Sequence, residues 1–163
     1  MHGYKKANSQ SDYQFLVSCF ENIGLKNVET FLSKMLVCDC IVGNFDRHYQ
    51  NFGAIRNVET LEYTRFAPIY DTGNSLWCNA EVLEQRKDYE YSAKPFGRNG
   101  MSPERQLELL KDFEWYDERK LDGFVEEAVD VLERNPNMPK ARIDKIAEGI
   151  REQIKIVKRR IKK

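Results

Sequence analysis

Three polar side chains of this chain have the types and the spacing that phosphoryl transfer from a nucleotide requires. Asp46 and Asn51 lie five residues apart in the stretch Asn-Phe-Asp-Arg-His-Tyr-Gln-Asn, and Asp71 follows twenty residues after Asn51. Such a transfer needs a carboxylate that accepts the proton of the attacking hydroxyl, and hard oxygen ligands for the magnesium that neutralises the phosphates. We therefore expect Asp46 to be the general base, and Asn51 and Asp71 to be the magnesium ligands.

A β-hairpin between Asn51 and Asp71 would bring these side chains together. Residues 52–56 and 61–66 are short alternating runs separated by Asn-Val-Glu-Thr, which is a hairpin signal. Two antiparallel strands return the chain to its starting level, so residues at the two ends of a hairpin can converge. We expect residues 71–74, Asp-Thr-Gly-Asn, to form a tight turn near its base.

Helical spacing of apolar residues predicts that the rest of the domain is mostly α. The predicted helices span residues 11–25, 28–42, 102–111, 117–134 and 139 to the C-terminal end. The second is apolar almost all round towards its end, which indicates a helix in the middle of the core. Residues 44–51 should form an ordered loop, and residues 79–100, which have no sustained period, a long surface segment. Five aromatic residues should pack between the hairpin and the helices: Phe52, Tyr63, Phe66, Tyr70 and Trp77.

The composition is that of an ordinary globular domain, and it argues against a membrane protein or a secreted protein. The 163 residues carry 26 basic and 26 acidic side chains, which is a formal net charge of zero. No apolar run approaches the ~20 residues of a membrane span, and the first ten residues are too polar for a signal peptide, so we expect a cytoplasmic protein. Residues 151–163 hold seven Lys and Arg against one acid. We interpret this tail as a solvated helix face and do not expect it to contact nucleic acid.

Two segments resemble the catalytic loop and the metal motif of the HipA-like serine/threonine kinases: residues 44–51, and Ala-Pro-Ile-Tyr-Asp at 67–71. Those are bacterial kinases with the toxin of a toxin–antitoxin pair as prototype. Ser-Ala-Lys-Pro-Phe at 92–96 resembles a loop farther along their helical lobe. The resemblance implies that residues 1–163 form a single domain, the helical C-terminal lobe of a protein-kinase-like fold. It further implies ATP and Mg²⁺ as cofactors, and a protein Ser/Thr hydroxyl as phosphate acceptor.

The resemblance also implies roles for the neighbours of Asp46. His48 stands two residues after Asp46, where many protein kinases have a lysine near the γ-phosphate, so it could donate a hydrogen bond there. Arg47 could contact a phosphate or form an ion pair that braces the loop, and Asn44 is expected to support the phosphate or the loop. The implied partners are a protein substrate or an antitoxin-like protein.

A second lobe is expected to complete the nucleotide site. No Gly-rich phosphate loop and no strand-borne lysine motif precede Asp46. We therefore expect that the N-lobe is not present in this chain, and that it comes from upstream sequence or from another chain. Whether the chain is active alone stays open.

Other interpretations remain open beside the kinase. Asp46 or Asn51 taken singly could merely hold a turn, and only their combination with Asp71 favours the kinase. Asp71-Thr72-Gly73 also matches the Asp-Thr-Gly turn of aspartic proteases, although one copy is present and that fold is all-β. A regulatory module that binds a nucleotide or partner without turnover, and a phosphatidylinositol-kinase-like lipid kinase, are the further alternatives.

Overall fold

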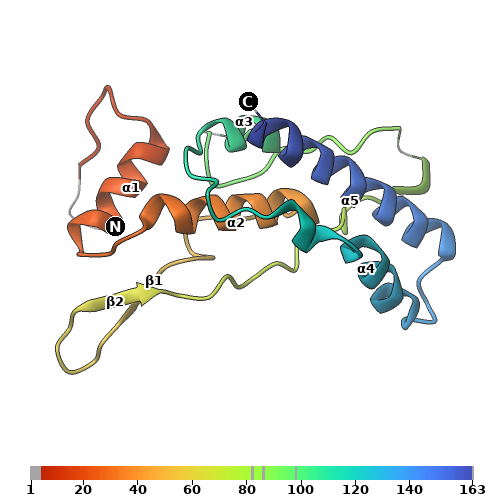
Figure 1. Cartoon of the computed structure of the whole chain (residues 1–163), viewed down its shortest axis with the longest axis horizontal. Coiled ribbons are helices and arrows are strands. Elements are labelled where there is room, and N and C mark those ends of the chain that lie inside the picture. The colour runs from red at the N-terminus through yellow and green to blue at the C-terminus, as the bar shows by residue number, and fades with distance from the viewer. Residues whose placement is uncertain (1–4, 82, 86, 98, 163) are drawn as a thin grey trace.

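The computed structural model describes residues 5–81, 83–85, 87–97 and 99–162. It is mostly helical with one two-stranded antiparallel sheet, which confirms the predicted helical class with a small hairpin (Figure 1). The elements are α1 (Asp12–Asn22), α2 (Val28–Val42), β1 (Ala54–Arg56), β2 (Tyr63–Phe66), the 3₁₀ turn η1 (Leu83–Gln85), α3 (Pro103–Glu108), the 3₁₀ turn η2 (Glu118–Leu121), α4 (Phe124–Glu133) and α5 (Lys140–Ile161). Within the described ranges, no helix is long and apolar enough to cross a membrane.

Helix α2 is the centre of the core, as its apolar sequence predicts. It runs along the middle of the molecule, with the long helix α5 packed across it and α3 beside both (Figure 1). It ends where predicted, because Gly43 takes a left-handed φ of 67° that stops the helix. Helix α1 begins with a capping box in which Ser11 and Gln14 satisfy each other's backbone N–H groups.

Gly149 of α5 lies against the indole ring of Trp77, and any side chain there would collide with it. A Cβ built on Gly149 would stand 2.4 Å from the Trp77 ring and 2.7 Å from the Tyr89 ring. We expect Gly149→Ala to lower the free energy of unfolding by about 1–3 kcal/mol despite the better helix propensity of alanine. Urea unfolding measures this. Gly53→Ala, whose Cβ would meet nothing within 4 Å, is the control, and equal stability of both variants would contradict the packing.

The prediction of a long surface segment at residues 79–100 is only partly correct, because many of its described residues are exposed but several are buried. Leu83 and Phe96 are almost completely buried, and Tyr89 and Ala93 are also buried. The segment has no period because it contributes these side chains to the core one at a time. Phe96 packs edge-on against Tyr13 of α1, with 5.6 Å between ring centroids.

Three further boundaries differ from the sequence prediction. The predicted helix at 117–134 is broken at Gly123, whose φ of 78° separates η2 from α4. Helix α3 ends at Glu108, earlier than predicted. The predicted turn at 71–74 is wrong, since the turn lies at residues 76–79.

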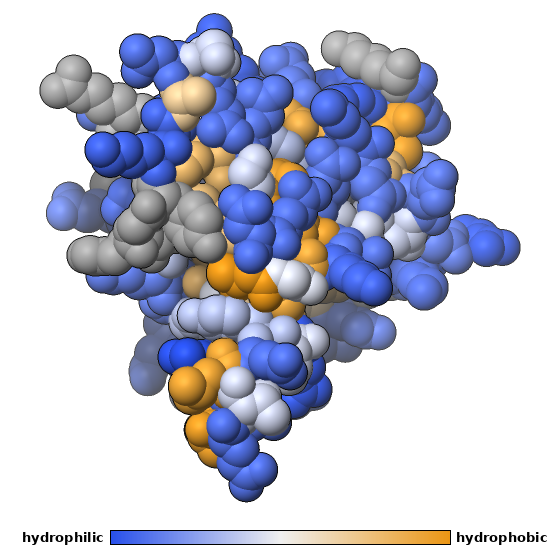
Figure 2. Space-filling view, turned by 90° about the vertical axis from the view of Figure 1, so that its left-hand side faces the viewer, coloured by the Kyte–Doolittle hydropathy of each residue, from blue (hydrophilic) through white to orange (hydrophobic). Residues whose placement is uncertain are grey.

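The hairpin projects from the helical body (Figure 1). Aromatic contacts anchor it at its base. Ala54 pairs with Phe66 across the two strands. Phe66 stacks on Phe31 of α2 with 4.0 Å between ring centroids, and meets Phe20 of α1 edge-on at 5.1 Å. Figure 2 shows apolar residues near the lower tip of the molecule. Val58 and Leu61, between the two strands, are exposed.

The five aromatic residues predicted for the core divide into two groups. Phe52 and Trp77 are buried and Phe66 is partly buried, as predicted. The prediction is wrong for Tyr63 and Tyr70, which are exposed. Tyr63 lies in β2, and its ring contacts the Arg56 guanidinium on the paired strand.

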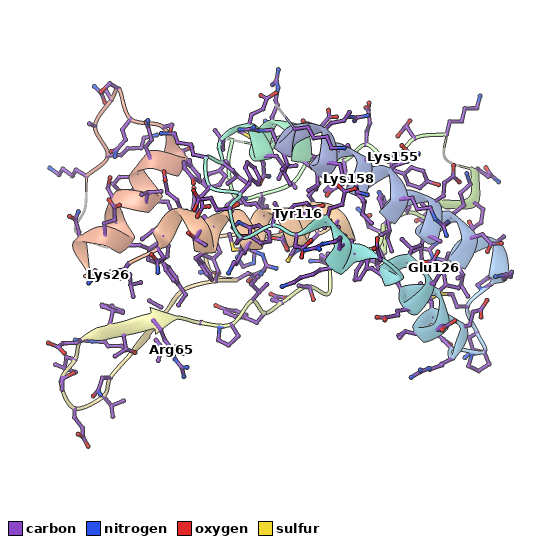
Figure 3. All side chains as sticks on the ribbon, viewed as in Figure 1. Lys26, Arg65, Tyr116, Glu126, Lys155 and Lys158 are labelled. Carbon is purple, nitrogen blue, oxygen red and sulfur yellow. The ribbon has the colours of Figure 1, made fainter. Side chains whose placement is uncertain are left out.

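The basic residues of the tail from 151 to 160 lie along α5, where Figure 3 labels Lys155 and Lys158. Four of them pair with carboxylates, among them Lys155 with Glu152 at 2.7 Å and Lys158 with Glu118 at 2.8 Å. These contacts are typical of a solvated face. That the tail does not contact nucleic acid stays a prediction.

Candidate active site

The loop after α2 is shaped by a buried asparagine. The Asn44 side chain donates from Nδ2 to Oδ1 of Asp39 at 2.8 Å, and its Oδ1 accepts the backbone N–H of Asp46 at 3.2 Å. Asp39 belongs to α2, so these two bonds connect the start of the loop to the central helix. Asn44 thereby sets the position of the backbone that carries Asp46.

Arg47 joins the parts of the site through a side chain that is completely buried. Its Nε and Nη2 each donate to a different oxygen of Asp39 at 2.8 Å, which is a bidentate pair. Its Nη1 donates to the Asn51 carbonyl at 2.8 Å and also to the Tyr70 carbonyl. One guanidinium therefore connects α2, the residue Asn51 and the residue before Asp71. These are the contacts of an ion pair that braces the loop. They use the N–H groups of the buried guanidinium, so Arg47 is not directed at the solvent side, where a nucleotide phosphate would bind.

The carboxylate of Asp46 is partly exposed and is held by two donors. Lys94 donates from Nζ to its Oδ1 at 2.7 Å, and Asn74 donates from Nδ2 to its Oδ2 at 3.0 Å. The hydrogen bond from Lys94, with a smaller contribution from Asn74, lowers the pKa of Asp46 below its ordinary value. An ionised, accessible carboxylate is the state in which Asp46 can accept the proton of a hydroxyl group.

The two predicted metal ligands differ in exposure. Asn51 is buried, and its Nδ2 donates to the Asp46 carbonyl at 3.1 Å, so its Oδ1 is the end of the amide that suits a cation. Asp71 is exposed and has a left-handed φ of 55°. Residues other than glycine in this region often mark functional sites. It directly follows Tyr70, whose carbonyl Arg47 holds.

The donor set suits magnesium that arrives with a nucleotide. Mg²⁺ usually takes one or two protein oxygens and completes its shell with phosphate oxygens and water. Asn51 and Asp71 offer one amide and one carboxylate oxygen, which fits this pattern. Across the described ranges, no cluster of three or more His, Cys, Asp and Glu could hold a metal without such help.

His48 supports the loop through local hydrogen bonds. Its backbone N–H donates to the Asp46 carbonyl at 2.8 Å, and its Nδ1 accepts the backbone N–H of Gln50 at 3.2 Å. The imidazole therefore stabilises the turn that follows Asp46. Its predicted contact with a phosphate stays a prediction.

Sequence reasoning missed three residues of the site: Asp39, Asn74 and Lys94. An available signal for Asp39 was that it is a charged residue in the second half of α2, residues 35–42, which is otherwise apolar. Lys94 was noticed only as part of a resembling segment, and Asn74 only as part of a predicted turn. The spacing of Asn74 and Lys94 in the sequence does not indicate that either residue contacts Asp46.

Comparison with known proteins finds similarity to a kinase in sequence and in fold. No family model matches the chain. The serine/threonine-protein kinase CtkA of Helicobacter pylori is 34% identical over 82 residues, which are 50% of this chain and 25% of CtkA. The crystal structure of an H. pylori proinflammatory kinase CtkA superposes with a TM-score of 0.62 at 21% identity, covering 96% of this chain and 63% of that one.

The chain covers less than two thirds of the length of either relative. The sequence match extends over half of the chain, and the structural match over nearly all of it. The predicted resemblance to the HipA-like serine/threonine kinases is therefore confirmed, since this chain is similar to one such kinase both in sequence and in fold.

Proposed function

We propose that the chain is the helical C-terminal lobe of a kinase that transfers the γ-phosphate of ATP to a Ser/Thr hydroxyl of a protein. The contacts of Arg47 support this most strongly. The same buried guanidinium binds the carbonyl of Asn51 and the carbonyl of the residue before Asp71, and the Asn51 side chain in turn donates to the Asp46 carbonyl. Residues twenty apart in the sequence thus belong to one hydrogen-bonded unit, as phosphoryl transfer requires.

Each residue has a distinct task in the proposed reaction. Asp46 accepts the proton of the acceptor hydroxyl and aims its oxygen at the γ-phosphorus. Asn51 and Asp71 hold Mg²⁺, which when bound neutralises charge on the phosphate oxygens. Arg47 and Asn44 keep the backbone of these ligands in place, and His48 supports the turn beside the phosphate.

A further lobe is proposed to cover the nucleotide. The solved relative is longer than this chain, which spans 63% of it. Apolar side chains near the site are exposed, with 41% of Tyr49 and 45% of Tyr70 accessible to solvent. We propose that an N-lobe, on the same protein or on a partner, packs over this surface and supplies the rest of the ATP pocket.

Magnesium-dependent binding of ATP tests the proposed ligands. We expect Asp71→Asn to weaken Mg²⁺-dependent binding of ATP at least about tenfold, because an amide replaces the negative charge that Mg²⁺ prefers. Isothermal titration calorimetry with and without Mg²⁺ measures this, first on the chain and then on the protein at its full natural length. Asp130→Asn, an exposed acid of α4, is the matched control. Unchanged affinity of the Asp71 variant would refute the metal assignment.

A further inference from the structure

A lysine from a distant segment contacts the proposed general base. Lys94 lies 48 residues after Asp46, and its Nζ is 2.7 Å from Oδ1 of that carboxylate. The Lys94 side chain is 54% exposed and the Asp46 side chain 26%. Both side chains of this ion pair are therefore partly accessible to solvent.

The backbone of Lys94 is fixed on both sides, unlike that of an ordinary surface lysine. Its N–H donates to the Phe45 carbonyl at 3.1 Å, so the lysine is attached to the residue before Asp46. The carbonyls of Ala93 and Lys94 accept from Nε2 of buried Gln106 at 2.6 and 3.0 Å. Phe96, two residues later, is buried in the core. Such support restricts where the ammonium can go and so positions it before substrate binds.

The other two basic side chains of the site, Arg47 and His48, are engaged elsewhere and do not contact the Asp46 carboxylate in this way. Arg47 is completely buried and directs its N–H groups to Asp39 and to two carbonyls. His48 uses its Nδ1 to stabilise the turn. Lys94 combines an exposed ammonium with direct contact to Asp46.

We propose that Lys94 is a further residue of the transfer step, an inference that rests on the proposed kinase function. In that step the acceptor oxygen bonds to the γ-phosphorus while the bond from phosphorus to the β–γ bridging oxygen breaks. ADP leaves with that electron pair, and the hydroxyl proton goes to Asp46. To react, the attacking oxygen must be within hydrogen-bonding distance of Asp46 and close to the γ-phosphorus. The Lys94 ammonium, which contacts the same carboxylate, is then next to the phosphoryl group that is transferred. Lys94 orients Asp46 and stabilises the negative charge that spreads over that group.

Kinetics of phosphoryl transfer test this role. The assay uses γ-labelled ATP, Mg²⁺ and casein as a general acceptor, with the protein at its full natural length. We expect Lys94→Met to lower kcat about 100-fold while the KM for ATP changes little, because the charge acts mainly in the transition state. Lys94→Arg should recover a large part of the rate. Lys120→Met removes an exposed charge on η2 and should leave the kinetics unchanged.

Asp46→Asn, measured in parallel, separates failure of this inference from failure of the proposed function. Loss of transfer in Asp46→Asn with a normal kcat in Lys94→Met would overturn the role of Lys94 and leave the kinase proposal standing. Equal loss in the Met and Arg variants would also overturn it, since the charge would then not matter. Transfer at the normal rate by Asp46→Asn, or no transfer by the unaltered protein, would overturn the proposed function and the role of Lys94 with it.

Discussion

Replacing Asp46 by Asn is expected to stop phosphoryl transfer while Mg²⁺-dependent ATP binding persists. The amide cannot take up the proton of the acceptor hydroxyl, and the loss of a positioned base typically costs about 10²- to 10⁴-fold in rate. The local structure should survive, because one oxygen of the new side chain can still accept from Lys94. The Asn74 amide can rotate to offer its own oxygen to the new NH₂ group.

Single-turnover transfer and calorimetric binding, measured on the same preparation, check both halves of this prediction. Asp130→Asn, the control used for Asp71, should transfer phosphate at the normal rate. Equal turnover by the Asp46 variant would exclude it as the base. Loss of ATP binding together with turnover would instead indicate that Asp46 belongs to the nucleotide site.

The helices could be predicted where their apolar pattern and their end signals lie within the helix itself. Helix α2 has the predicted bounds because its apolar surface and the stop at Gly43 act locally. Helix α1 likewise carries its own cap at Ser11. The strands are shorter than predicted, and their pairing is irregular between Ile55 and Arg56. Residues 79–100 could not be predicted, because their buried side chains are selected by the helices that they pack against.

The candidate site also has a part that the sequence predicts and a part that it does not. The candidates Asp46, Asn51 and Asp71 follow from residue types and short spacing, and their chemical roles stay predictions. The contacts that support them cross long separations in the sequence. Lys94 reaches Asp46 over 48 residues, and Arg47 reaches the Tyr70 carbonyl over 23. Only the folded chain brings such partners together, so spacing rules could not identify them.

The ion pair between Arg47 and Asp39 should contribute most to the stability of the site. Arg47→Met keeps much of the side-chain volume but leaves the Asp39 carboxylate buried without a cation, and the Asn51 and Tyr70 carbonyls without their donor. Removing one partner of a buried pair typically costs about 3–5 kcal/mol. We expect a loss of this size in the free energy of unfolding, measured with urea. Lys140→Met, which breaks exposed pairs with Glu133 and Asp144, should cost less than about 1 kcal/mol.

A double variant separates the stability of this pair from its effect on the metal ligands. Asp39→Asn combined with Arg47→Met removes the unpaired charge, so the pair of changes should cost less than the sum of the two single changes. Strict additivity would contradict a direct interaction between the two side chains. The folded double variant should still lose Mg²⁺-dependent ATP binding, because the hydrogen bonds from one guanidinium to the Asn51 and Tyr70 carbonyls are then gone. Normal binding by this variant would mean that the two ligands are positioned without Arg47, and would remove the main structural support for the proposed site.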